Sequence, residues 1–318
     1  MATADQIKGL IKAHLDQDSD KFKTVVLQIA ANEVKLGHTK LAREIKALID
    51  KKPACSNIAS IINQNQMLLM VTPNERLSDL VVPDDLRNRL QRVLDEFVNR
   101  KKLHKYGLTN RRKLLLEGKS GTGKTLSASI IATELNLPLF IVQADKLVTK
   151  YMGETSAKLR QIFDSIETIM GVYLFDEFDA IGADRSIDND VGEMRRVLNS
   201  FLQFLEQDQS ESIIIAATNN QQILDKALFR RFDDVLHYAY PTEDEISQLY
   251  INKLCLFDPT FELSQELINN TTALSQAEIS RICDDVIKRS ILNDAKITHD
   301  SLTESVMERL AVYEMEAL

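Results

Sequence analysis

The sequence has few cysteines and no long apolar run. Its three cysteines, Cys55, Cys255 and Cys283, are far apart and lack the spacing of paired metal ligands. Neither a disulfide framework nor a zinc site is expected, and the compartment is expected to be reducing. No stretch approaches the ~18 uncharged apolar residues of a membrane helix, and the charged N-terminus lacks the apolar core of a signal peptide. We therefore expect a soluble, cytoplasmic protein without membrane contact.

Basic residues are also fewer than acidic ones. The chain has 39 Lys and Arg residues against 47 Asp and Glu residues, which gives a formal net charge of −8. This balance disfavours sequence-independent binding to phosphate backbones, so no nucleic-acid partner is expected. The chain is long and rich in apolar residues: 44% of its 318 residues are hydrophobic. That is enough for a sizeable core and roughly two domains of ordinary size.

The pattern of apolar residues divides the chain into four parts. Three helical patches between residues 4 and 50 predict a small N-terminal helical module over 1–52. Residues 53–78 show no sustained period and are interpreted as a linker. Short apolar runs alternate with helical patterns over 79–241, and only helical patterns follow over 242–318.

That alternation predicts an α/β fold. The strand patterns lie at 113–117, 137–142, 171–175 and 213–217, and the helical patterns lie at 84–103, 155–169 and 191–206. Buried strands that alternate with helices indicate a parallel sheet with helices on both faces. Further helices are expected at 243–255, 263–270, 276–292 and 300–317. We therefore expect a parallel α/β sheet followed by a C-terminal helical subdomain, or lid.

One glycine-bearing segment follows the first strand pattern and fits G-x-x-x-x-G-K-[ST], the P-loop pattern, so the expected fold class is a P-loop sheet. Its members are Gly118, Lys119, Ser120, Gly121, Thr122, Gly123, Lys124 and Thr125. Glycines let the backbone wrap a polyphosphate, so that its N–H groups and the start of the next helix point at negative charge. We expect Lys124 to reach the outer phosphates of ATP and the Thr125 hydroxyl to bind Mg²⁺.

Polar residues follow two other strand patterns. Asp176 and Glu177 come directly after the run that ends at Phe175, and Asn219 follows the run 213–217. Asp176 is expected to hold Mg²⁺, and Glu177 is placed to polarise the attacking water. Asn219 emerges at the same edge of the sheet and is a candidate to orient that water, although asparagine is also common in simple turns.

Two adjacent arginines, Arg230 and Arg231, stand between apolar residues in this acidic protein. They could pair with Asp233 and Asp234. Beside a P-loop, an arginine supplied by a neighbouring subunit can instead neutralise transition-state charge. Oligomerisation would then be part of the mechanism.

Together, these segments resemble the AAA+ ATPases, and within them the AAA clade proper, which includes katanin, spastin and the FtsH-type proteases. The resemblance covers residues 79–310 and rests on GKSGTGKT, VYLFDEFDAIGADR, IIIAATNN, ALFRRFDD and LSQAEISRICDD. It implies a hexameric ring that hydrolyses ATP, with Arg230 and Arg231 as fingers acting on the next subunit. The short arginine segment is similar to that of bacterial, single-ring members, some of which are encoded beside a protease.

The resemblance also extends to a pore loop. Tyr151, Met152 and Gly153 resemble the aromatic-hydrophobic-glycine loop of polypeptide-translocating members. An aromatic side chain on such a loop can grip an extended chain regardless of its sequence. The implied function is the remodelling or unfolding of a protein substrate. Core packing of Tyr151 is the alternative.

The adenine-side residues depart from the family pattern. Val81 and Val82 stand where relatives place backbone against adenine, but the usual glycine is missing. Gln276 and Ala277 follow Ser275 where relatives have Ser-Gly-Ala. The resemblance implies nucleotide contacts for these four residues.

Other functions remain open from the sequence. The N-terminal module is expected to select a substrate or adaptor, to help oligomers form, or only to stabilise the chain. The whole protein could instead be a nucleic-acid loader, which its charge and the lack of a helix-turn-helix signal disfavour. A third candidate is an ATP-dependent switch that serves as an assembly platform for an effector such as a protease.

Overall fold

The computed structural model describes residues 24–30, 32, 38, 67–147, 154–178, 191–219, 229–255, 257–259 and 261–316. The side chains of residues 145, 191–196 and 312–316 are outside this description. The chain divides into two units, Met1–Ile61 and Ile62–Leu318. In the first unit, residues 24–30 are helical, and the rest of the predicted N-terminal helices lie outside the described residues.

The second unit is built on a six-stranded sheet with the order β1-β3-β4-β5-β2-β6. Its strands are β1 (Leu68–Val71), β2 (Lys113–Gly118), β3 (Leu139–Val142), β4 (Val172–Phe175), β5 (Ile213–Thr218) and β6 (Asp234–Tyr238). Every neighbouring pair is parallel except β1 and β3. Parallel strands are covered on both faces, which is why β4 and β5 are buried along their whole length. The predicted α/β class is confirmed.

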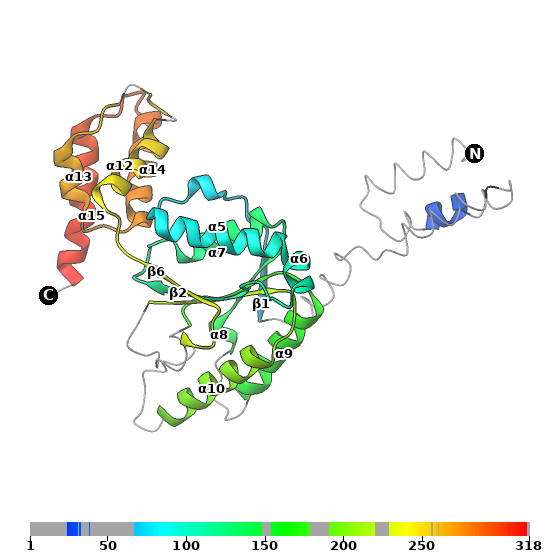
Figure 1. Cartoon of the computed structure of the whole chain (residues 1–318). Coiled ribbons are helices and arrows are strands. Elements are labelled where there is room, and N and C mark those ends of the chain that lie inside the picture. Colours follow the sequence, from blue (N-terminus) through cyan, green and yellow to red (C-terminus); the bar gives the residue numbers. More distant parts are fainter. Residues whose placement is uncertain are drawn as a thin grey trace. The chain divides into compact units, whose positions relative to one another are not determined.

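Helices cover both faces of the sheet (Figure 1). On one face lie α5 (Asp84–Val98) and α7 (Lys124–Glu134), and on the other lie α9 (Glu154–Thr168) and α10 (Val191–Gln207). Leu90, Val93 and Ile131 anchor the first layer in the main core. In the second layer, Phe201 packs edge-on against Phe175 of β4, with ring centroids 4.9 Å apart.

Short elements connect these layers. They are η1 (Leu77–Asp79), α6 (Arg100–Lys105) and α8 (Ala144–Leu147). The helix expected over 84–103 is divided at Asn99 into α5 and α6. The Asn99 side chain donates a hydrogen bond to the Asp95 carbonyl at 2.8 Å, which satisfies one carbonyl in the last turn of α5.

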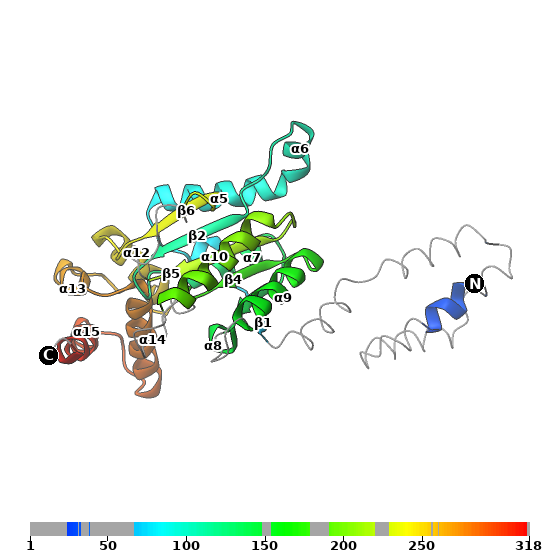
Figure 2. The same ribbon diagram turned by 90° about the horizontal axis from the view of Figure 1, so that it is seen from below.

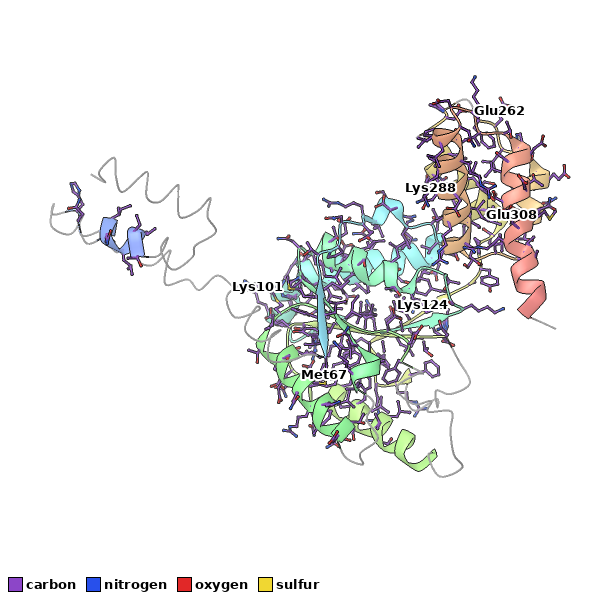
Figure 3. The ribbon with its side chains drawn as sticks, turned by 180° about the vertical axis from the view of Figure 1, so that it is seen from behind. Met67, Lys101, Lys124, Glu262, Lys288 and Glu308 are labelled. Carbon is purple, nitrogen blue, oxygen red and sulfur yellow. The ribbon has the colours of Figure 1, made fainter. Side chains whose placement is uncertain are left out.

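Four helices form the C-terminal subdomain, which lies at one end of the sheet (Figure 2). They are α12 (Glu243–Leu254), α13 (Gln265–Thr271), α14 (Gln276–Leu292) and α15 (His299–Glu316). A core of its own, which includes Ile246, Tyr250 and Val286, holds them together. The charged side chains of Lys288 and Glu308 lie on the outside of this subdomain (Figure 3).

Two strands were not predicted from the sequence. β1 lies inside the stretch 53–78, where the sequence pattern predicts a linker, and pairs antiparallel with β3. β6 pairs parallel with β2 although its sequence, DVLHY, alternates weakly between polar and apolar residues. Both are edge strands, so only one side of each is paired and their burial is partial. Edge strands need less apolar character than central ones, which leaves a weaker signal in the sequence.

Within the described residues, no helix is both long enough and apolar enough to cross a membrane.

Candidate functional site

The phosphate-loop segment joins β2 to the start of α7. Its backbone needs positive φ angles at Gly121 (76°) and Gly123 (98°), which favour glycine. At Gly118, a β-carbon would meet the Cβ of Tyr238 at 2.8 Å and would also crowd the Tyr238 carbonyl. Glycine is therefore required there because the neighbouring strand β6 passes so close to the end of β2.

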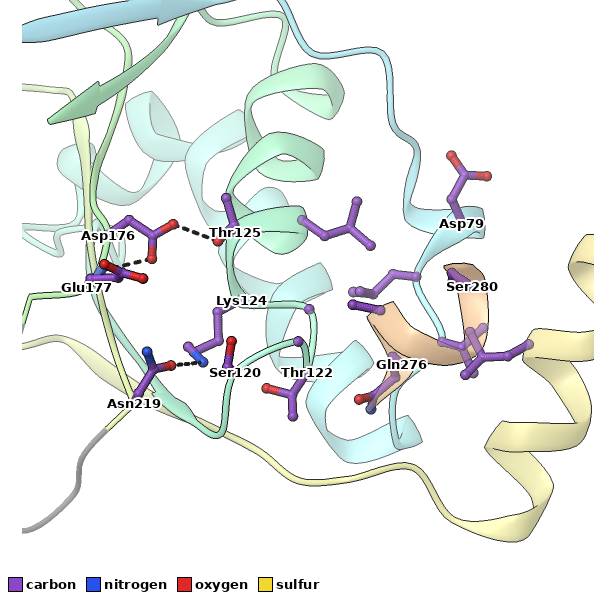
Figure 4. A pocket seen from close by; sticks show the side chains of 17 residues that line it. Asp79, Ser120, Thr122, Lys124, Thr125, Asp176, Glu177, Asn219, Gln276 and Ser280 are labelled. Atoms are coloured by element: carbon purple, nitrogen blue, oxygen red, sulfur yellow. Dashed lines mark hydrogen bonds between the residues drawn. The ribbon is translucent and has the colours of Figure 1, made fainter. Parts of the chain in front are cut away.

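Lys124 begins α7 and is buried. Its Nζ donates hydrogen bonds to the carbonyl oxygens of Gly118 (2.7 Å) and Lys119 (2.8 Å) and to Asn219 Oδ1 (2.8 Å). These contacts hold the ammonium beneath the loop and join it to the residue that follows β5 (Figure 4). An ammonium has three protons to donate, so a phosphate oxygen must displace one of these acceptors to bind it directly.

The acidic residues after β4 lie opposite the start of α7. Thr125 Oγ1 donates a hydrogen bond to Asp176 Oδ2 at 2.7 Å, and the Glu177 N–H donates to Asp176 Oδ1 at 2.9 Å. A hydroxyl beside a carboxylate is the kind of oxygen donor set that Mg²⁺ prefers, so this pair fits that metal. Among the described residues, no group of three or more His, Cys, Asp and Glu side chains forms a metal cluster.

Glu177 has a positive φ of 48°, which is uncommon for a residue with a side chain. The Phe178 N–H donates to the Ala217 carbonyl on β5 at 2.8 Å, and this bond holds the chain on the far side of Glu177. Backbone strain of this kind persists where the surroundings over-determine it, and it is frequent at functional sites. The Glu177 side chain is exposed and lines the same cavity as Asp176.

These side chains surround a cavity of about 300 Å³. Of the residues predicted to bind nucleotide or to act on it, the cavity brings together Val81, Ser120, Gly121, Thr122, Gly123, Lys124, Thr125, Asp176, Glu177, Asn219, Gln276 and Ala277. The helical subdomain contributes one wall, and the Ala277 N–H donates to the Gly121 carbonyl at 3.0 Å. The phosphate loop and the lid are therefore in direct contact.

Some predicted residues are not brought to the cavity. Val82 packs into the main core, whereas Val81 packs with the lid, because successive side chains of an extended segment point in opposite directions. The Lys119 side chain lies over the Tyr240 ring, 4.8 Å from its centroid. Tyr151, Met152 and Gly153 lie outside the described residues.

The arginines also lie apart from the cavity lining. Arg231 forms an ion pair with Glu206 at 2.7 Å, and Arg230 is exposed. The alternative pairing with Asp233 and Asp234 is not observed. Asp233 instead accepts hydrogen bonds from the N–H groups of Arg112 and Lys113, and Asp234 is paired with Arg89.

Five further residues that the sequence does not predict also line the cavity. Asp79, Leu80, Leu126, Leu249 and Ser280 line it together with the predicted residues. They come from four segments that are far apart in the chain, and a leucine or serine in a helix or turn carries no local sign of a ligand. Only the tertiary structure brings them together.

Comparison with known proteins identifies the family. Residues 114–240 match the family model described as AAA, the ATPase family associated with various cellular activities. A Sinorhizobium fredii protein described as an uncharacterized AAA family ATPase is 33% identical over 312 residues, which cover 93% of this chain and 92% of that protein.

Two further relatives are longer than the region they share with this chain. A putative 26S proteasome regulatory subunit homolog of Methanocaldococcus jannaschii is 28% identical, over 69% of this chain and 60% of that protein. The ATP-dependent zinc metalloprotease FtsH 2 of a Thermoanaerobacter species is 29% identical, over 75% of this chain and 48% of that protein. The phosphate loop, the acids after β4 and these similarities agree, and the chain belongs to the AAA family and is an ATP-hydrolysing enzyme.

Proposed function

We propose that copies of this chain assemble into a ring, hexameric as in the family it resembles, and that ATP hydrolysis drives this ring to remodel, unfold or translocate a protein substrate. The observation that carries the proposal is the composition of the cavity. It gathers Lys124, Thr125, Asp176, Glu177 and Asn219, but its lining in the described part of the chain contains no arginine. A second subunit would supply the missing cation.

Arg230 and Arg231 are suited to that role. Arg230 is exposed, and the Arg231–Glu206 pair is open to solvent, with side chains 34% and 53% exposed. A pair this exposed contributes only about 0–1 kcal/mol, so Arg231 can exchange it for a phosphate at little cost. An arginine supplied to an NTPase site in this way raises the rate by roughly 10³–10⁵.

Within one subunit, each polar residue has a role that its contacts support. The loop N–H groups and Lys124 hold the phosphates of ATP, and Thr125 and Asp176 hold Mg²⁺. The metal supplies charge neutralisation at the phosphates. Glu177 takes a proton from the attacking water, and Asn219 orients that water. Asn219 Oδ1 accepts a hydrogen bond from Lys124 in this structure, so a phosphate that takes the place of Asn219 on Lys124 would free the Asn219 amide to orient the water.

The handling of a protein substrate is supported by the relatives. Two of them carry names that refer to the 26S proteasome or to a protease. Tyr151, Met152 and Gly153 are proposed to grip the substrate, and residues 1–52 to select it or an adaptor. Where the substrate is degraded, the ring is proposed to pass it to a separate protease.

Mixing two inactive variants tests the shared site. Glu177→Gln removes the base but keeps both arginines, whereas Arg230→Ala, Arg231→Ala keeps the base and removes them. If a neighbour supplies the arginine, mixed rings regain ATPase activity at the interfaces that combine an intact Glu177 with intact arginines. No recovery in rings shown to be mixed would refute an arginine supplied in trans. The single arginine variants identify the principal finger.

The pore-loop role has its own test. Tyr151→Ala should abolish ATP-dependent unfolding of a fluorescent protein fused to an unstructured tail. Tyr106→Ala is the matched control, because Tyr106 is a highly exposed tyrosine (76%) far along the chain from the loop. Normal unfolding by the Tyr151 variant would exclude the grip.

A further inference from the structure

One buried oxygen in the wall of the cavity has no hydrogen-bond partner. Among the described residues, two buried side-chain oxygens make no hydrogen bond, Glu117 Oε2 and Gln276 Oε1. The first lies 2.9 Å from His237 Nδ1 and so has a polar neighbour. Gln276 Oε1 makes no hydrogen bond, although the residue is only 8% exposed. A buried acceptor without a donor is costly, which makes this atom the place to look for a ligand group.

A hydrogen bond to the backbone of Ala239 fixes the orientation of the Gln276 amide. Its Nε2 donates a hydrogen bond to the Ala239 carbonyl at 3.2 Å. The reversed amide would place two carbonyl oxygens at this distance, so the nitrogen must face Ala239. The oxygen therefore points away from Ala239, and in Figure 4 the amide extends from the first turn of α14 toward the side of the phosphate loop.

Gln276 lies in the first turn of α14 and lines the cavity. Its neighbour Ala277 donates to the Gly121 carbonyl, so this turn of α14 lies directly against the phosphate loop. Leu80, Val81 and Leu249 give the same cavity an apolar wall. A nucleotide with its phosphates on the loop would extend its nucleoside along this apolar wall, past Gln276.

We propose that Gln276 Oε1 accepts a hydrogen bond from the nucleoside of the bound nucleotide and thereby contributes to nucleotide selection. The inference rests on the proposed assignment of this cavity to the nucleotide. The ligand chemistry is a neutral N–H or O–H donor, which adenosine offers at its 6-amino group and at its two ribose hydroxyls. A site built around a hydrogen bond rejects analogues that lack the donor, because the buried acceptor is then left unpaired.

The test compares ADP with three analogues that each lack one donor: purine riboside diphosphate, 2′-deoxy-ADP and 3′-deoxy-ADP. Diphosphates avoid hydrolysis during the measurement. Competition against a fluorescent nucleotide on the full chain should show that one analogue binds roughly 3- to 10-fold more weakly than ADP. The analogue that is rejected identifies the donor. Equal affinity for all four nucleotides would overturn the proposal.

The variant Gln276→Met should remove this discrimination, so that ADP and the rejected analogue bind equally. Gln248→Met is the matched control, because Gln248 is an exposed glutamine of the same subdomain and should leave the discrimination intact. Discrimination that persists in a folded Gln276→Met protein would also overturn the proposal. Lys124→Ala distinguishes a failure of the Gln276 hydrogen bond from a failure of the cavity assignment. If the Lys124→Ala variant binds ADP like the parent, the cavity is not the nucleotide site.

Discussion

The close contact between the phosphate loop and the lid makes a specific prediction for Gly121→Ala. A β-carbon on Gly121 would lie 2.9 Å from Ser275 Cβ and 3.3 Å from Ala277 Cβ, and it would also crowd the Ser275 hydroxyl. Real β-carbons do not approach other atoms this closely, so either the loop or the start of α14 must shift. The substitution should therefore separate the lid from the loop that it contacts.

Two energy terms add in this variant. The φ of Gly121 is 76°, and an alanine held in this left-handed region costs about 1–2 kcal/mol. Forcing additional carbon into a packed contact costs about 1–3 kcal/mol. The total is about 2–5 kcal/mol, which will be divided between a lower free energy of unfolding and a weaker affinity for nucleotide.

Gly107→Ala isolates the first term. Gly107 has nearly the same φ, 74°, but a β-carbon there would meet nothing within 4 Å. It should lose only about 1–2 kcal/mol of unfolding free energy and should bind ADP like the parent. Urea unfolding gives the stabilities, and fluorescence titration gives the ADP dissociation constants.

The second term should be partly reversible. Ser275→Gly removes the two Ser275 atoms that collide with the new methyl group, and glycine is tolerated at this helix N-cap at a cost of only a few tenths of a kcal/mol. The double variant Gly121→Ala, Ser275→Gly should therefore recover part of the ADP affinity. If Gly121→Ala is no more perturbed than Gly107→Ala in either measurement, the contact between lid and loop does not matter energetically.

Three further predictions follow from single contacts. Glu177→Gln should bind ATP with nearly parental affinity but hydrolyse it at least 10²-fold more slowly, and a parental rate in a phosphate-release assay would contradict its assignment as the base. Burial raises the pKa of the Cys283 thiol to about 12, so the thiol is protonated at pH 8. Cys283 should therefore resist iodoacetamide at pH 8 until urea unfolds the chain, and peptide mass spectrometry would follow the reaction. Thr242→Ala removes the capping box with Glu245 at the start of α12 and should lower the free energy of unfolding by about 1 kcal/mol in urea titrations, with the exposed Thr272 as a control position.

The central strands and most helices could be predicted from the sequence because burial on both faces leaves continuous apolar runs. The pattern at 276–292 coincides with α14, and the patterns at 155–169 and 191–206 differ by one residue from the ends of α9 and α10. β1 and β6 escaped prediction because an edge strand is paired on one side only, so its residues need not be apolar throughout.

The sequence by itself determined the phosphate loop and the family. The loop requires glycines at fixed spacing, and the acids must follow a buried strand directly, so both constraints are local and are written in consecutive residues. The tertiary structure decided what faces this loop. Parallel pairing of β2 with β5 brings Asn219 to Lys124, and packing of the lid brings Gln276 and Ala277 against Gly121 and Ala239. These contacts join residues far apart in the chain, and no local pattern specifies them.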